Sequence, residues 1–290
     1  MTLKLQQYTL VTVVLALAVA GVARDARADE TLNETASPGH MRADHVENGE
    51  HWRLDSGNGV VHVWRPPGYD ARTAGTVVYL HGHRSSADES FNQFAMATQF
   101  HRSGLNALFI VPDSTTDGEE GLHWDSLGAL LRYVARETGV QRGPGSLVVV
   151  GHSGAFRNIV AWLDDREIDD LILLDALYSY EDEFRSWILS SKNAEKKRLT
   201  LVSRDTRRNA LRFMRGISWS VGVTKIPASY GGLNKRQRDA RILNMRSQYE
   251  HMEIVTSGHV IPVVLQRTRL RPLGAPAPAA PAAVVSTASR

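Results

Sequence analysis

The chain has 290 residues, of which 42% are hydrophobic, 22% charged and 7% aromatic, a composition typical of a folded globular protein. It excludes a wholly disordered chain, a collagen-like repeat and a protein with many membrane spans. The 34 basic and 31 acidic residues nearly cancel to a formal charge of +3, so nucleic acid is not an expected partner. The absence of cysteine excludes disulfides, thiolate catalysis, zinc–cysteine sites and iron–sulfur clusters.

The amino terminus has the layout of a secretory signal. Lys4 supplies a positive charge, residues 10–23 (LVTVVLALAVAGVA) are uncharged and apolar, and the small-residue site Ala26-Arg27-Ala28 follows. This stretch is short for a membrane span and soon meets charged residues, which favours cleavage over anchoring. We expect residues 1–28 to be a signal peptide, with no stable membrane span after its cleavage. The mature protein is then periplasmic or secreted, which suits a chain without cysteine; an uncleaved anchor is the alternative.

The rest of the chain divides by composition into three parts. Residues 29–50 are polar and predict a leader segment, and residues 271–290 are rich in proline and alanine and predict a flexible tail. Between them, residues 51–270 alternate short apolar, β-branched runs with helical patterns. The runs lie at 60–64, 76–80, 107–111, 146–150, 171–174 and 199–202, with another within 242–256, and the helical patterns lie at 91–104, 124–139 and 155–167. This alternation predicts an α/β domain, a mostly parallel sheet covered by helices on both faces.

The candidate nucleophile is Ser153, in the string Gly151-His152-Ser153-Gly154-Ala155 between an apolar run and a helical pattern. A serine on a sharp turn from a buried strand into a helix projects its hydroxyl above the sheet, and flanking glycines avoid clashes with the turn and the neighbouring strand. The N–H groups and dipole at the start of the helix would favour a developing oxyanion. A phosphate-binding loop and an ordinary tight turn are the alternatives.

This segment resembles the nucleophile elbow of the α/β-hydrolase superfamily, G-x-S-x-G, with Ala155 in place of the last glycine. The resemblance extends through the order of strands from about residue 51 to 270 and implies an α/β-hydrolase-like serine hydrolase. The pair His81-Gly82, at the end of an apolar run, resembles the start of the family's oxyanion loop. By that resemblance the backbone N–H groups of His83 and Gly154 form the oxyanion hole.

His81 and His83 also alternate as the ligands of a metal site do. The longer HxHxD pattern of metallo-β-lactamase-like hydrolases needs an acid at position 85, where Ser85 stands, and Asp88 lies too far along the chain. We therefore expect neither a metal nor another cofactor, and metal catalysis is the minor alternative.

A serine nucleophile needs a base and an orienting acid, which in this family follow in the order serine, acid, histidine. Asp175 and Asp205 each follow an apolar run, and the family resemblance favours Asp205 because it follows the later one. The residues favour Asp175, because a carboxylate set among apolar neighbours is costly unless specific partners hold it. Asp205 has another explanation, as the amino-terminal cap of a helix at 206–214. We therefore choose Asp175, with Asp205 as the alternative.

Two histidines compete for the role of base. If the last strand is 241–248, His251 lies at its tip and a loop leads to a terminal helix that starts at Pro262. If the last strand is 252–256, the base is His259. The first arrangement leaves more room before the terminal helix, so we choose His251, with His259 as the alternative.

Residues 176–189 and 213–227 are candidate lids over an acyl chain, although packing of an insertion against the domain explains them more simply. The expected reaction is hydrolysis of a carboxylic ester, because an ester has a good leaving group, and the expected substrate is a small-molecule or lipid-like ester. A peptidase or amidase on the same scaffold and a catalytically inactive secreted binding module are the alternatives.

Overall fold

The computed structural model describes residues 41–114, 122–190 and 193–276. The predicted signal peptide, residues 1–28, lies outside these ranges, as do residues 29–40 of the predicted leader segment and residues 277–290 of the predicted tail. Within the described ranges, no helix has both the length and the apolar character needed to cross a membrane.

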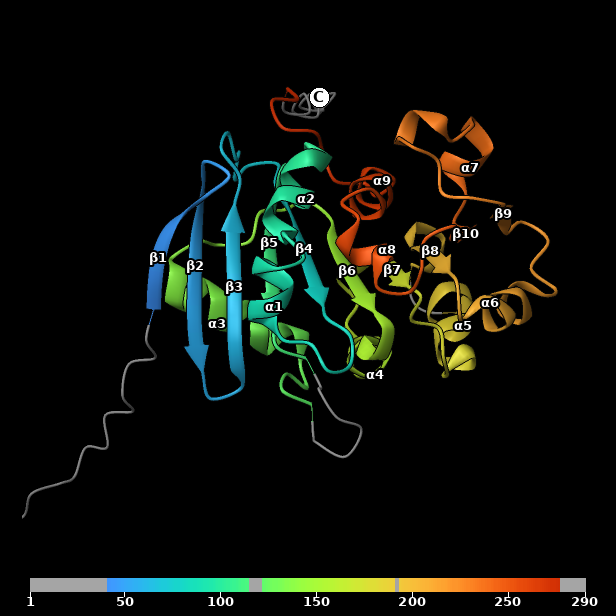
Figure 1. Ribbon diagram of the computed structural model, residues 1–290, viewed down its shortest axis with the longest axis horizontal. Coiled ribbons are helices and arrows are strands. Elements are labelled where there is room, and N and C mark those ends of the chain that lie inside the picture. The colour runs from blue at the N-terminus through green and yellow to red at the C-terminus, as the bar shows by residue number, and fades with distance from the viewer. Residues whose placement is uncertain (1–40, 115–121, 191–192, 277–290) are drawn as a thin grey trace, which may run out of the picture. The chain divides into compact units, whose positions relative to one another are not determined.

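The strands form one twisted sheet (Figure 1). They are β1 (Met41–Val46), β2 (Gly49–Ser56), β3 (Gly59–Arg65), β4 (Gly75–Leu80), β5 (Ala107–Pro112), β6 (Leu147–His152), β7 (Ile168–Leu174), β8 (Arg198–Ser203), β9 (Val221–Val223) and β10 (Ile242–Arg246). Their order across the sheet is β1-β2-β3-β5-β4-β6-β7-β8-β10-β9. The pairs β1–β2, β2–β3 and β3–β5 are antiparallel, and every pair from β5–β4 onward is parallel. The expected α/β class and mostly parallel sheet are confirmed.

Helices cover both faces of the sheet, as expected. They are α1 (Ala87–Asn92), α2 (Met96–Ser103), α3 (Leu127–Thr138), α4 (Phe156–Trp162), α5 (Glu181–Ser190), α6 (Arg207–Met214), α7 (Lys235–Asp239), α8 (Glu253–Thr256) and α9 (Val260–Gln266). Apolar residues of α1, α2, α8 and α9 pack into one core layer, and those of α3, α4, α5 and α6 pack into the layer on the other face. Parallel strands buried on both faces account for the continuous apolar runs in the sequence.

The folded domain begins before residue 51, so the predicted leader segment is wrong for residues 41–50. Residues 41–46 and 49–56 pair as a hairpin, whose turn residues Glu47 and Asn48 both have positive φ. The hairpin is anchored to the sheet, because the indole N–H of Trp64 donates to the carbonyl of Val46 at 2.8 Å. An edge strand with mostly exposed side chains has the polar composition of a linker, which hid β1 in the sequence.

The predicted flexible tail is likewise wrong for its first residues. The backbone N–H of Asn106 donates to the carbonyl of Arg271 at 2.7 Å, and that of Leu273 donates to the carbonyl of Gly104 at 2.8 Å. Leu105 and Pro272 form an antiparallel bridge between these two bonds. These contacts bind residues 271–273 to the segment between α2 and β5. The proline- and alanine-rich composition did not reveal this pairing, because backbone hydrogen bonds do not depend on the side chains.

Candidate active site

The predicted site residues gather at the carboxyl ends of neighbouring parallel strands. Ser153 follows β6, Asp175 follows β7, and His251 lies in the loop after β10. Because these strands are parallel, their carboxyl ends share one edge of the sheet, which is where ligands bind in open α/β sheets.

Ser153 lies on a sharp turn between β6 and α4. Its φ is +52°, in the left-handed region that costs a residue with a side chain about 1–2 kcal/mol. The turn brings α4 back against the strand, because a Cβ on Gly151 would lie 2.5 Å from Cδ1 of Ile159 and 3.1 Å from Cβ of Ala155. A methyl group at position 155 is therefore accommodated because position 151 has no side chain. This geometry explains how Ala155 replaces the glycine of the usual pattern.

The loop after β4 approaches this turn closely. A Cβ on Gly82 would lie 2.9 Å from Cβ of Ser153, so only glycine lets the loop pass the serine without a shift. A Cβ on Gly154 would lie 3.3 Å from the backbone nitrogen of His83. The structure thus brings the backbones of His83 and Gly154 together beside Ser153. These are the two residues whose N–H groups the family resemblance assigns to an oxyanion hole.

Asp175 is fully buried at the end of β7, with a φ of +45°. Its Oδ1 accepts hydrogen bonds from the backbone N–H groups of Arg204 and Thr206, both at 2.9 Å, and from the hydroxyl of Thr206 at 2.7 Å. Its Oδ2 accepts from the backbone N–H of Asp205 at 3.1 Å and from Nδ1 of His251 at 2.8 Å. Specific partners therefore hold this carboxylate, as expected for an acid set among apolar neighbours.

These bonds fix the charge of Asp175. Burial by itself raises the pKa of a carboxyl group, but the hydrogen bonds from His251, Thr206 and Arg204 outweigh burial and hold the pKa of Asp175 well below its ordinary value. The carboxylate is therefore ionised at neutral pH and keeps a proton on Nδ1 of His251, which leaves Nε2 as the basic nitrogen of that ring.

Asp205 lies at the margin of this arrangement. Its side chain is half exposed, and its Oδ2 is 3.9 Å from Nδ1 of His251, beyond hydrogen-bond distance. The expected role of Asp205 as a helix cap is wrong, because the N-cap of α6 is Thr206 and has no side-chain cap bond. The backbone N–H groups of Asp205 and Thr206, which precede the helix, donate to the carboxylate of Asp175.

His259 is not among the partners of Asp175 in the described part of the chain. Residues 253–256 form helix α8 and not a strand, and β10 ends at Arg246, so the arrangement that favoured His259 does not occur. His259 is exposed at the start of α9, where its ring stacks on Tyr249 with centroids 6.4 Å apart. The structure therefore brings His251, and not His259, to the buried acid.

His152 was missed by the sequence reasoning, although it lies inside the recognised string. Its side chain is buried, and its Nε2–H donates to the backbone carbonyl of His251 at 3.2 Å while the two rings lie 4.6 Å apart. Burial, reinforced by the nearby ring of His251, lowers the pKa of His152 to about 3, so the ring stays neutral. His152 thus links the turn of Ser153 to the loop that holds His251.

His81, one of the two histidines that suggested a metal, is held by other contacts. His81 is fully buried; its Nε2 accepts the backbone N–H of Ser114 at 2.9 Å, and its Nδ1 donates to the carbonyl of Gly82 at 2.9 Å. Both ring nitrogens of His81 are therefore occupied. Ligand atoms of Asp175, Asp205 and His251 do lie within 4.8 Å of one another, but both oxygens of Asp175 already accept hydrogen bonds.

A cavity of about 270 Å³ opens beside Ser153. It is lined by His83, Ser153, Gly154, Phe156, Arg157 and Tyr178. Tyr178 is 43% exposed and lies edge-on to the ring of His251, with centroids 6.4 Å apart. Of the candidate lid at 176–189, Tyr178 therefore reaches the site, whereas Phe184 and Trp187 are buried in the core; no residue of 213–227 lines this cavity.

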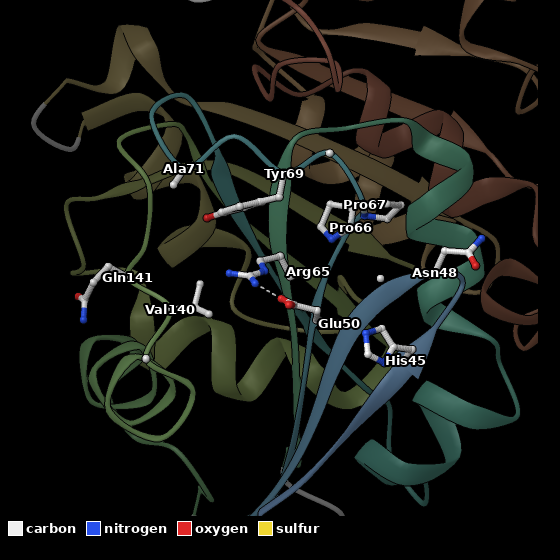
Figure 2. A pocket seen from close by; sticks show the side chains of 13 residues that line it. His45, Asn48, Glu50, Arg65, Pro66, Pro67, Tyr69, Ala71, Val140 and Gln141 are labelled. Carbon is white, nitrogen blue, oxygen red and sulfur yellow. Dashed lines mark ion pairs between the residues drawn. The ribbon is translucent and has the colours of Figure 1, made fainter.

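A larger cavity, of about 740 Å³, lies elsewhere (Figure 2). It is lined by the turn between β1 and β2, the start of β2, the end of β3 and the segments after β3 and α3, and two of its lining residues, Arg65 and Glu50, form an ion pair. None of the predicted site residues lines it, so its size does not make it the site of Ser153 chemistry.

Comparison with known proteins identifies the fold. No protein-family model and no curated protein sequence matches the chain. Among solved structures, the chain is similar to a protein described as FAE, with 10% identity, a TM-score of 0.50, and coverage of 80% of this chain and 90% of that one. A feruloyl esterase module from Clostridium thermocellum, complexed with sinapinate, gives 10% identity, a TM-score of 0.48, and coverage of 80% and 90%. An S-formylglutathione hydrolase from Agrobacterium tumefaciens gives 12% identity, a TM-score of 0.46, and coverage of 79% of this chain and 99% of that one.

Identity this low shows the fold alone. With the mostly parallel sheet and the helices on both of its faces, that likeness means that the chain has the fold of the α/β-hydrolase superfamily.

Proposed function

We propose that this protein hydrolyses carboxylic esters, with Ser153 as nucleophile, His251 as general base and Asp175 as the orienting acid. One observation carries the proposal: a fully buried carboxylate binds Nδ1 of a histidine at 2.8 Å, at the same sheet edge as a serine on a left-handed strand-to-helix turn. Buried ionised groups are costly, and a site that keeps one bound to a histidine is organised to fix that imidazole.

The proposed reaction proceeds through an acyl-enzyme. Oγ of Ser153 bonds to the acyl carbon while Nε2 of His251 takes the hydroxyl proton, and the carbonyl electrons move onto the oxygen. When the carbonyl re-forms, the bond to the alcohol oxygen breaks, and His251 returns the proton to that oxygen. Water then attacks the acyl carbon while His251 takes its proton. The bond to Oγ of Ser153 breaks and His251 returns the proton to Oγ, which releases the acid and restores Ser153. The ionised Asp175 stabilises the imidazolium formed in each half.

The oxyanion hole in this proposal consists of the backbone N–H groups of His83 and Gly154. The close approach of the two backbones, enforced at Gly82, supports it. Removing one donor of an oxyanion hole in other hydrolases costs about 10²–10³ in rate, so a fixed pair of amides would supply a large part of the acceleration.

The cavity beside Ser153 favours a small acyl or alcohol group over a long chain. Its volume of about 270 Å³ is just below the range of about 300–1,000 Å³ that is typical of ligand pockets. We therefore propose a small-molecule ester as the substrate. We also propose that the enzyme acts in the periplasm or outside the cell, on the basis of the apolar stretch 10–23 and the site at Ala26–Ala28.

The test is hydrolysis of 4-nitrophenyl acetate by the purified protein and by its Ser153→Ala variant. Ser153→Ala is expected to lower kcat/KM by several orders of magnitude, about 10⁴ or more, with little change in the melting temperature, because the hydroxyl supports no core. Equal activity in the two proteins would reject Ser153 as the nucleophile.

A further inference from the structure

Arg157 is a cation at the mouth of the candidate site. It lies in the first turn of α4 with an exposed side chain and lines the same cavity as Ser153. Its Nη1 would be 3.5 Å from a Cβ on Gly154, and its guanidinium carbon lies 4.8 Å from the centroid of the Phe156 ring. The contact with the ring restrains a side chain that would otherwise extend into water. The charge is therefore held beside the residue proposed for the oxyanion hole.

The charge on Arg157 is not neutralised by an ion pair among the described residues. The other residues that line the cavity are His83, Ser153, Gly154, Phe156 and Tyr178, and none of them carries a carboxylate. The nearest acid of the mechanism, Asp175, is buried and bound to His251. A substrate that enters this cavity thus meets one fixed positive charge.

The neighbouring cavity has the opposite character. It is lined by Tyr178, Ser179, Tyr180, the three acidic residues of the first turn of α5 and a single cation, Arg212, which already pairs with Glu181. Negative charge on a substrate is therefore favoured on the Arg157 side of Ser153 and disfavoured beyond Tyr180. Since Arg157 lies next to Gly154, the charged group must be only a few bonds from the reacting carbonyl.

We propose that Arg157 makes this enzyme selective for esters whose acyl group carries a carboxylate near the scissile bond, such as half-esters of short dicarboxylic acids. The guanidinium binds the carboxylate through charge-assisted hydrogen bonds while the ester carbonyl lies against Ser153. This inference rests on the proposed function of Ser153, and the experiment below separates the two.

The experiment compares two ethyl esters of the same shape, monoethyl succinate and ethyl 4-methylpentanoate, in which an isopropyl group replaces the carboxylate. Acid release is followed by pH-stat titration at pH 7.5, where the succinate carboxylate is ionised. We expect the protein to prefer the succinate half-ester. Arg157→Met, which keeps the aliphatic stem, should lower kcat/KM for that ester by about 10- to 100-fold and change the neutral ester little.

Two control variants and the 4-nitrophenyl acetate assay make the result decisive. Arg157→Lys should restore part of the preference, because it keeps the charge but not the paired donors. Arg208→Met removes an exposed arginine of α6 that lines neither cavity, and it should leave both rates unchanged. No preference in the unmodified protein, or an equal fall for both esters in Arg157→Met, would overturn the selectivity while Ser153-dependent hydrolysis of 4-nitrophenyl acetate still stood. If the unmodified protein does not hydrolyse 4-nitrophenyl acetate in a Ser153-dependent way, the proposed function itself is overturned.

Discussion

Replacing Asp175 by asparagine tests how the buried acid acts. Asparagine keeps the shape and tolerates the positive φ at this position, but it replaces one carboxylate oxygen by an NH₂ group. At Oδ1 that group would face three donors, from Arg204 and from the backbone and hydroxyl of Thr206. At Oδ2 it would face two, the backbone N–H of Asp205 and Nδ1 of His251. The amide is therefore expected to place NH₂ at the Oδ2 position.

This placement reverses the tautomer of His251. Nδ1 can avoid the new donor only by losing its proton and accepting from NH₂, which moves the ring proton to Nε2. The ring then cannot accept the proton of Ser153, so kcat should fall by about 10⁴, equivalent to about 5.5 kcal/mol of barrier. The backbone N–H of Asp205 remains opposed to NH₂, and this should cost about 1–3 kcal/mol of folding stability.

The assay is steady-state hydrolysis of 4-nitrophenyl acetate by Asp175→Asn and Asp205→Asn, with urea unfolding of both variants to separate rate from stability. Asp205→Asn is the matched control, because its side chain is half exposed and lies beyond hydrogen-bond distance of His251. We expect it to change kcat little. An Asp175→Asn variant that keeps more than about a tenth of the activity would refute the tautomer argument. A larger loss of activity in Asp205→Asn than in Asp175→Asn would assign the orienting acid to Asp205.

Three further predictions concern the base, the pH dependence of stability and the export of the protein. His251→Ala should remove nearly all ester turnover, whereas His259→Ala, which loses only a surface stack on Tyr249, should keep most of it; single-variant kinetics with thermal melts check this, and a reversed ranking contradicts it. Because the folded pKa of His152 is about 3, against about 6.5 when unfolded, protonation of the unfolded chain should weaken the fold as pH falls below 6.5. Between pH 7 and pH 5 the free energy of unfolding of His152→Gln should therefore fall by about 2 kcal/mol less than that of the parent protein. Urea unfolding of both proteins at the two pH values measures this, and an equal fall in both would contradict it. Amino-terminal sequencing of exported protein should begin at Asp29, and a mature chain that starts at Met1 would refute cleavage after Ala28.

Much of the fold could be read from the sequence because its parallel strands are buried on both faces. Each of the predicted runs lies in a strand, except that the run at 146–150 begins one residue before β6, and the run expected within 242–256 is β10. The edge strand β1 was missed because its side chains are mostly exposed and give no apolar pattern. The predicted helix at 91–104 is divided between α1 and α2, since Ala95 between them adopts a φ of +51°. An alanine in the sequence does not predict this left-handed conformation.

The site was harder to predict than the fold, because its contacts join distant parts of the chain. The isolation of Asp175 among apolar residues indicated a specifically held acid, but its partners lie 29 to 31 residues later and at position 251. The cap assigned to Asp205 failed because the helix begins one residue later than expected, with Thr206 as its N-cap and no side-chain cap bond. His152 and Arg157 gave no signal in the sequence: His152 is a buried neighbour of His251, and Arg157 is notable only because it packs on Phe156 and lines the cavity beside Ser153.

The most direct test of the central claim is covalent labelling with a fluorophosphonate, which reacts with a serine activated by its own base and oxyanion hole. Intact-mass spectrometry of the native protein should show one phosphonyl adduct, and peptide mapping should place it on Ser153. Ser153→Ala and heat-unfolded protein should remain unlabelled. Native protein that gains no adduct, or an adduct on another residue while ester hydrolysis proceeds, would contradict the assignment of Ser153 as an activated nucleophile.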